Sequence, residues 1–207
     1  MRISRMLVAG VAAATALTVS VAGCGGNKTS APASTTKSGS ATSATSSSGP
    51  APSAPAQPSD YTRLLIQATD INAPVQFKGS PPVNNPNGQP GVATTFSTED
   101  NSHVIKDTIQ VLADPAAATD ALNAAKGEHA KAIKNPQTGS ANVGTGATTL
   151  SGNFPDNSKG VMILLFTEGN AFVTLEFDGP TDSLPPQDFV NDVAQKQAAA
   201  IKKGLGG

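Results

Sequence analysis

The sequence predicts an α+β domain: an antiparallel sheet of about five strands packed against two or three helices. Residues 160–166 and 171–177 are apolar stretches separated by a tight turn, which is the pattern of a β-hairpin. Residues 114–133 and 187–203 carry apolar side chains at helical spacing. All seven phenylalanines and the single tyrosine lie at or beyond Tyr61, so the packed domain is expected over residues 60–205, after a signal peptide and a disordered linker.

The first 23 residues have the three parts of a secretory signal peptide. Arg2 and Arg5 make the start basic, and an apolar stretch rich in small residues follows over residues 6–21. A transmembrane helix would need about 20 strongly apolar residues, which is longer than this stretch. A free thiol in an ordinary soluble protein would leave the leader unexplained.

The leader ends at Val21-Ala22-Gly23-Cys24, and Cys24 is the only cysteine of the chain. These four residues resemble the bacterial lipobox. The resemblance implies that the Cys24 sulfur receives a diacylglyceryl group and that residues 1–23 are removed. We therefore expect a protein that is lipid-anchored on the extracytoplasmic face of the cell membrane, with Cys24 as its lipidation site.

Residues 24–59 follow as a tether made almost entirely of Ser, Thr, Ala, Pro and Gly. No apolar side chain larger than alanine occurs after Cys24 in this segment, so no core can offset the entropy cost of ordering it. We expect a disordered chain that spans roughly 30–35 Å. Thr35-Thr36 and Ser46-Ser47-Ser48 are candidate O-glycosylation sites, and a bare linker is the equal alternative.

The first half of the domain is expected to hold one helix and one hairpin. Ser59 or Asp60 would cap a helix that ends before Pro74, with Leu64, Leu65, Ala68 and Ile71 at helical spacing. Residues 78–91, rich in proline and asparagine, are expected to form a loop. Residues 92–98 and 104–112 alternate apolar and polar side chains, so they predict two strands with one solvated face.

The second half is expected to hold two helices and three strands. Asp114-Pro115 predicts a helix start, and Asn135-Pro136 ends that helix. A polar loop over residues 137–147 and a short strand at 148–150 would follow. The six apolar residues of 161–166 predict a central strand covered on both faces, and residues 171–177 alternate between the two faces. Residues 187–203 predict the closing helix, with Gly204 as its C-cap.

The sequence contains no catalytic motif, and we assign no catalytic residue, metal ligand or cofactor. His103 and His129 are the only histidines, and neither has a second ligand at metal spacing. We expect His129 at the edge of the core with one hydrogen bond, and His103 in a surface salt bridge with Glu99 or Asp100. The net charge of −1 and the few scattered basic residues argue against nucleic-acid binding.

One candidate binding region remains. Val161 to Phe166, with Phe172 opposite, would line a cleft between the sheet and the helices, gated by the segments 78–91 and 137–147. The alternative is that these apolar residues are simply the core of the domain.

The opening Leu64-Leu65-x-x-Ala68-x-Asp70-Ile71-Asn72, after a lipobox and a Ser/Thr/Pro tether, resembles small cell-envelope lipoproteins of mycobacteria and related actinobacteria. It is also similar to the extracytoplasmic sensor domains of mycobacterial receptor Ser/Thr kinases, and the closing helix from Asp188 is similar in placement. The resemblance covers roughly residues 60–205. Those sensor domains carry paired disulfides around a cleft, whereas this chain has a single cysteine.

We therefore expect a non-catalytic binding or interaction module of the cell envelope, anchored to the membrane through Cys24. Its partner would be an envelope protein, a cell-wall component or an apolar small molecule. The alternatives are an envelope enzyme of hydrolase type, whose residues meet only in three dimensions, and a carrier of an apolar ligand.

Overall fold

The computed structural model describes residues 60–181 and 183–206, which belong to the second of the chain's two compact units, Ala51–Gly207. The expected signal peptide, the expected tether and Cys24, the predicted lipidation site, lie outside the described residues.

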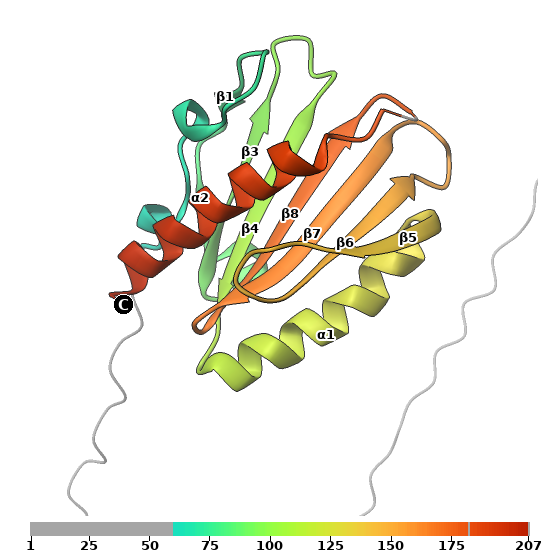
Figure 1. The fold of residues 1–207 in the computed structure, drawn as a ribbon. Helices are drawn as coiled ribbons and strands as arrows, with labels where there is room; N and C mark the ends of the chain where they lie inside the picture. Colours follow the sequence, from blue (N-terminus) through green and yellow to red (C-terminus); the bar gives the residue numbers. More distant parts are fainter. Residues whose placement is uncertain (1–59, 182, 207) are drawn as a thin grey trace, which may run out of the picture. The chain divides into compact units, whose positions relative to one another are not determined.

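The domain is built on one antiparallel sheet of eight strands (Figure 1). The strands are β1 (Lys78–Gly79), β2 (Val83–Asn84), β3 (Gly91–Ser97), β4 (Val104–Val111), β5 (Lys134–Ser140), β6 (Thr145–Asn153), β7 (Gly160–Glu168) and β8 (Ala171–Gly179). Their order in the sheet is β1-β3-β4-β8-β7-β6-β5, and β2 also pairs with β3. The α+β class is confirmed, while the expected number of strands is too low.

Two α-helices and three short 3₁₀ helices complete the described part of the chain. They are α1 (Pro115–Ala132), α2 (Gln187–Leu205), η1 (Thr62–Leu64), η2 (Ala68–Asp70) and η3 (Pro86–Gly88). Asp114 caps α1 by accepting a hydrogen bond from the Ala117 N–H at 2.8 Å, as its Asp-Pro start predicts. Figure 1 shows α2 lying across the near face of the sheet.

Each helix covers its own face of the sheet. Leu164 of β7 and Val173 of β8 belong to the larger apolar cluster, which also contains the buried side chains of α2. Ile163 and Phe172, one residue away on the same strands, pack instead with Ala118 and Leu122 of α1. Residues 160–167 of β7 are all buried, which confirms the prediction of a central strand covered on both faces.

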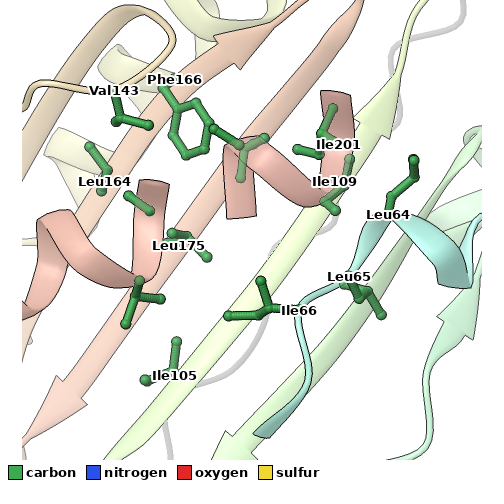
Figure 2. Close-up of a cluster of buried hydrophobic side chains, with 14 of the residues drawn as sticks. Leu64, Leu65, Ile66, Ile105, Ile109, Val143, Leu164, Phe166, Leu175 and Ile201 are labelled. Carbon is green, nitrogen blue, oxygen red and sulfur yellow. The ribbon is translucent and has the colours of Figure 1, made fainter. Parts of the chain in front are cut away.

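The expected helix over residues 60–71 is wrong, because η1 and η2 are separate turns joined by extended backbone at Leu65 and Gln67. The apolar residues that suggested a helical stripe are buried all the same. Figure 2 shows Leu64, Leu65 and Ile66 pointing into the larger cluster with Ile109 and Ile201. A buried glutamine replaces the missing helical hydrogen bonds: Gln197 of α2 accepts from the Ile66 N–H and donates to the Leu64 carbonyl.

The two expected loops are also wrong. Segment 78–91 contains β1, β2 and η3, and segment 137–147 contains most of β5 and the start of β6. The sequence concealed β5 because all seven of its residues are exposed, so it carries no apolar alternation.

The end of α2 differs from the expectation by two residues. The C-cap is Gly206, in the left-handed region at φ 78°, and not Gly204. Gly204 lies inside α2, where a Cβ atom would collide with the Leu64 side chain.

Candidate ligand-binding pocket

An apolar pocket of about 300 Å³ opens at the end of the sheet where α2 begins. Four segments line it: residues 72–75 with Phe77, residues 103–105 at the start of β4, residues 177–179 at the end of β8, and residues 183–186 with Phe189. The volume lies at the lower end of the range for small-molecule sites, which are concave and mostly apolar. We call this site the apolar pocket.

Phenylalanine side chains form the wall of the apolar pocket. Phe77, Phe177 and Phe189 all line it, and the rings of Phe177 and Phe189 meet edge to face with their centroids 6.0 Å apart. This arrangement is favourable for aromatic rings and holds them in a defined position.

The rim of the apolar pocket exposes apolar side chains to solvent. Val75 is 47% exposed and Leu184 is 41% exposed. Among the described residues the only other large hydrophobic side chain that is exposed is Val83, which lies in β2 and outside this pocket. Two of the three thus gather at one opening, as expected where an apolar partner binds.

Prolines shape the two segments that carry the rim. Pro74 precedes Val75, and Pro185-Pro186 separates Leu184 from the first turn of α2. Proline fixes its own φ and pushes the preceding residue into extended backbone. Both segments therefore pass the end of the sheet as irregular chain and present their apolar side chains at the opening.

His103 is a polar residue of the pocket lining, and its environment differs from the expected salt bridge. Its Nδ1 lies 2.9 Å from the Ser102 hydroxyl, while Glu99 pairs with Lys78 at 3.7 Å. Asp100 accepts hydrogen bonds from the hydroxyls of Thr98 (2.7 Å) and Ser102 (2.8 Å) and from the Ser102 N–H (3.1 Å). These bonds, that from Thr98 first, lower the pKa of Asp100 to about 2.

The hydrogen-bonded series Asp100–Ser102–His103 is not a hydrolase triad. In a triad the histidine lies between the carboxylate and the nucleophilic hydroxyl, so that it can take the hydroxyl proton. Here the serine lies between the other two, and its hydroxyl donates to the Asp100 carboxylate. The arrangement orients an imidazole and does not activate a nucleophile.

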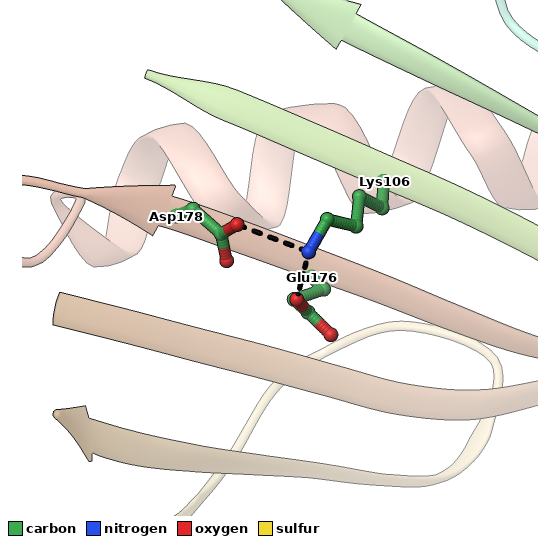
Figure 3. Close-up of polar contacts among 3 residues, drawn as sticks. All are labelled: Lys106, Glu176 and Asp178. Atoms are coloured by element: carbon green, nitrogen blue, oxygen red, sulfur yellow. Dashed lines mark hydrogen bonds and ion pairs between the residues drawn. The ribbon is translucent and has the colours of Figure 1, made fainter. Parts of the chain in front are cut away.

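A cluster of three charged side chains lies near the apolar pocket, on the opposite face of the sheet. Lys106 donates to Glu176 at 2.6 Å and lies 3.1 Å from Asp178 (Figure 3). Burial by itself lowers the pKa of Lys106, but the hydrogen bonds to the two carboxylates raise it overall. Lys106 and Glu176 alternate with Ile105 and Phe177 of the pocket lining, so this ion pair neutralises charge on the sheet face opposite to α2.

A second hollow, of about 480 Å³, lies between the η1–η2 segment and strands β1 and β3. Its lining includes polar residues such as Arg63, Ser80 and Thr94 beside Phe96. It lacks the clustered aromatic wall and the exposed apolar rim, so the apolar pocket is the better candidate for a ligand site.

The predicted cleft along Val161–Phe166 and Phe172 is wrong, and the alternative that these residues are core is confirmed. Val161, Leu164, Leu165 and Phe166 are 0% exposed, and none of the predicted residues lines the apolar pocket. The pocket lies instead at the end of β4 and β8. The sequence signal that marks it is a pair of apolar side chains beside prolines, Pro74-Val75 and Leu184-Pro185.

His129 lies half-buried in the last turn of α1, at the edge of the core as expected. Within the described range its ring makes no hydrogen bond, although one was expected. Across residues 60–181 and 183–206, no group of three or more His, Cys, Asp and Glu residues could hold a metal ion. In the same ranges no helix is long and apolar enough to span a membrane.

The chain matches no model of a known protein family and no curated protein sequence. Its fold is similar to the crystal structure of the extracellular domain of PknH from Mycobacterium tuberculosis, with a TM-score of 0.51 and 9% sequence identity. The match covers 71% of this chain and 95% of the PknH domain. This likeness concerns the fold of a mycobacterial extracellular domain.

Proposed function

We propose that this protein is a membrane-anchored extracytoplasmic lipoprotein whose domain is a non-catalytic binding module of the cell envelope, and that the apolar pocket is its binding site. The aromatic-lined pocket with its exposed apolar rim carries the proposal. The ligand is a small apolar molecule, or an apolar group presented by a cell-wall component or an envelope protein.

The extracytoplasmic location rests on three supports. The leader of residues 1–23 and the lipobox ending at Cys24 predict export and lipidation. The fold is that of a domain found outside the cell in another protein. The Ser/Thr/Pro-rich tether of residues 24–59 has the composition of a linker between a membrane anchor and a domain.

The non-catalytic character rests on the pocket lining. No Ser–His or carboxylate pair in the described lining has the geometry of a nucleophile with its base, and the one serine–histidine contact has the wrong order for a triad. A pocket of about 300 Å³ accepts one ring system or one short acyl chain, which favours recognition of an apolar group over enclosure of a whole diacyl lipid.

Charge placed on the rim tests the proposal. Leu184→Glu and Val75→Glu put a carboxylate beside the apolar opening, whereas Val83→Glu makes the same change at an exposed apolar residue outside the pocket. With naphthalene as the probe, followed by its fluorescence, we expect the two rim variants to bind at least about tenfold more weakly, which is about 1.4 kcal/mol. Val83→Glu should bind like the unchanged protein. Equal losses in all three variants, or no loss in any, would contradict the assignment of the site.

A further inference from the structure

We infer that the apolar pocket selects apolar molecules that carry one hydrogen-bond donor, a hydroxyl or an N–H, and that Nε2 of His103 is the acceptor. This inference rests on the proposed function, because it assigns the ligand class of the same pocket.

The Ser102 hydroxyl carries a single proton, and Asp100 determines where it points. Asp100 is an ionised carboxylate at neutral pH and can only accept hydrogen bonds. The Ser102 hydroxyl lies 2.8 Å from it and 3.5 Å from the Thr98 hydroxyl, whose own proton goes to Asp100 at 2.7 Å. The single Ser102 proton therefore points at Asp100, since a bond to a charged acceptor is the stronger one.

The direction of this proton determines the tautomer of His103. Because the Ser102 hydroxyl directs its only proton into the hydrogen bond to Asp100, it can only accept from the imidazole, and Nδ1 lies 2.9 Å away. Nδ1 therefore carries a proton. In a neutral imidazole with one N–H at Nδ1, Nε2 holds the free lone pair and is an acceptor.

Nε2 of His103 is accessible. It has no hydrogen-bond partner among the described residues. Buried polar side-chain atoms without a partner occur there only in Tyr61, Asp107 and Asp178, so Nε2 of the half-buried His103 is open to a ligand. An accessible acceptor of fixed orientation in an otherwise apolar lining gives a pocket its specificity, because a ligand that cannot pair with it leaves it desolvated.

The rest of the lining favours a donor over an anion. No lysine or arginine lines the pocket, and the Asp178 carboxylate is paired with Lys106 on the other face of the sheet. Asn72 and Ser183 are exposed at the opening, which leaves the half-buried imidazole of His103 as the polar ring of the lining. A ligand carboxylate would meet no fixed positive charge here.

Three probes of similar shape test the inference: naphthalene, 2-methoxynaphthalene and 2-naphthol. We expect 2-naphthol to bind the protein about three- to tenfold more tightly than 2-methoxynaphthalene, the usual worth of one hydrogen bond. His103→Phe should remove this preference and keep the affinity for 2-methoxynaphthalene. His129→Phe changes the other histidine of the sequence, which lies on α1, and should keep the preference.

A second variant tests the orienting role of Ser102. Ser102→Ala removes the acceptor that holds the proton on Nδ1, so the tautomer is no longer fixed. We expect the preference for 2-naphthol to shrink while the affinity for naphthalene is unchanged. This variant keeps the imidazole of His103. It therefore separates the effect of a fixed tautomer from the effect of having a ring at this position.

The outcomes separate this inference from the proposed function. Equal binding of all three probes, or an unchanged preference in His103→Phe, would overturn the inference and leave the pocket as a binding site. Tighter binding of 2-naphthoate than of 2-naphthol would overturn it as well, because it would show an anion site. Failure of every probe to bind, naphthalene included, would overturn the proposed function itself.

Discussion

Asp107 is a carboxylic acid in the middle of an apolar core. It alternates with Ile105 and Ile109 on the face of β4 that α2 covers, and it is 0% exposed. Neither carboxyl oxygen has a hydrogen-bond partner within the described residues. Desolvation raises the pKa of Asp107 to about 8, so the folded protein holds this group in its neutral form at neutral pH.

This burial predicts a pH-dependent stability of definite sign. In the unfolded chain Asp107 loses its proton near pH 4, while in the folded chain it keeps it up to about pH 8. The folded state therefore binds more protons over this interval. The group's contribution to stability is full below about pH 4, falls as the pH rises to about 8, and stays low above that.

Asp107→Asn tests this directly, because asparagine has the shape of the protonated acid and does not titrate. We expect the variant to be more stable than the unchanged protein at pH 7.5, on the order of a few kcal/mol, and nearly equal to it at pH 4. Urea unfolding at several pH values measures both. Asp120→Asn, at an exposed position of α1, is the control. A variant with the same pH slope as the unchanged protein would show that Asp107 is ionised in the fold.

Gln197 joins the N-terminal segment to α2. It is 0% exposed; its Nε2 donates to the Leu64 carbonyl at 2.6 Å and its Oε1 accepts from the Ile66 N–H at 3.2 Å. These bonds explain why residues 60–71 need no helix of their own, since a buried backbone group without a partner is costly. The amide takes the place of the internal bonds that a helix would supply.

We expect Gln197→Ala to destabilise the domain by about 2–4 kcal/mol, because two buried backbone groups lose their partners and a cavity forms. Gln195→Ala, on the exposed side of the same helix, is the matched control and should change the free energy of unfolding by less than about 0.5 kcal/mol. Chemical unfolding of both variants measures the difference. Equal small effects would contradict the role given to Gln197.

Helices and strands whose apolar residues recur at a regular spacing can be predicted from the sequence. The spacing of α1 and α2, the alternation of β8 and the unbroken apolar run of β7 each reflect burial against one or two layers. The segment 60–71 was not predictable in the same way. Its apolar residues are buried by irregular chain that Gln197 holds, and that contact joins residues more than 130 positions apart.

The same physics explains the missed strands and the missed pocket. β5 is an exposed edge strand, and its pairing with β6 needs only backbone groups. The pocket joins Val75, His103, Phe177 and Leu184 from four separate segments. Only the sheet order, with β4 beside β8, brings those segments to one end of the domain.

At the scale of the whole molecule, the anchor on Cys24 stays a prediction of the sequence. We expect the native protein, extracted from membranes, to lack residues 1–23 and to carry added diacylglyceryl and acyl mass on Cys24. One acyl chain holds a protein at a membrane only weakly, whereas two or three acyl chains hold it firmly. Intact mass measurement of the native protein and of Cys24→Ala checks this. An unmodified cysteine on an uncleaved or soluble chain would contradict the anchor and the localisation together.

Helices cover both faces of the central strands, and the apolar pocket opens at one end of the sheet. The large apolar side chains in the middle of β7 and β8 are packed in the two cores, so a ligand cannot enter there between sheet and helix without unpacking them. The end of the sheet is different, because Val75 and Leu184 stay exposed there beside an aromatic wall. Binding should therefore leave the fold unchanged.

A map of the binding site on the protein itself would test the apolar pocket most directly. Backbone amide chemical shifts, followed by NMR during titration with 2-naphthol, would locate the ligand. We expect the changes to gather at residues 72–77, 103–105, 177–179 and 183–189, with little change along α1. Changes centred on the hollow beside η1 and η2, or none at all, would contradict the account.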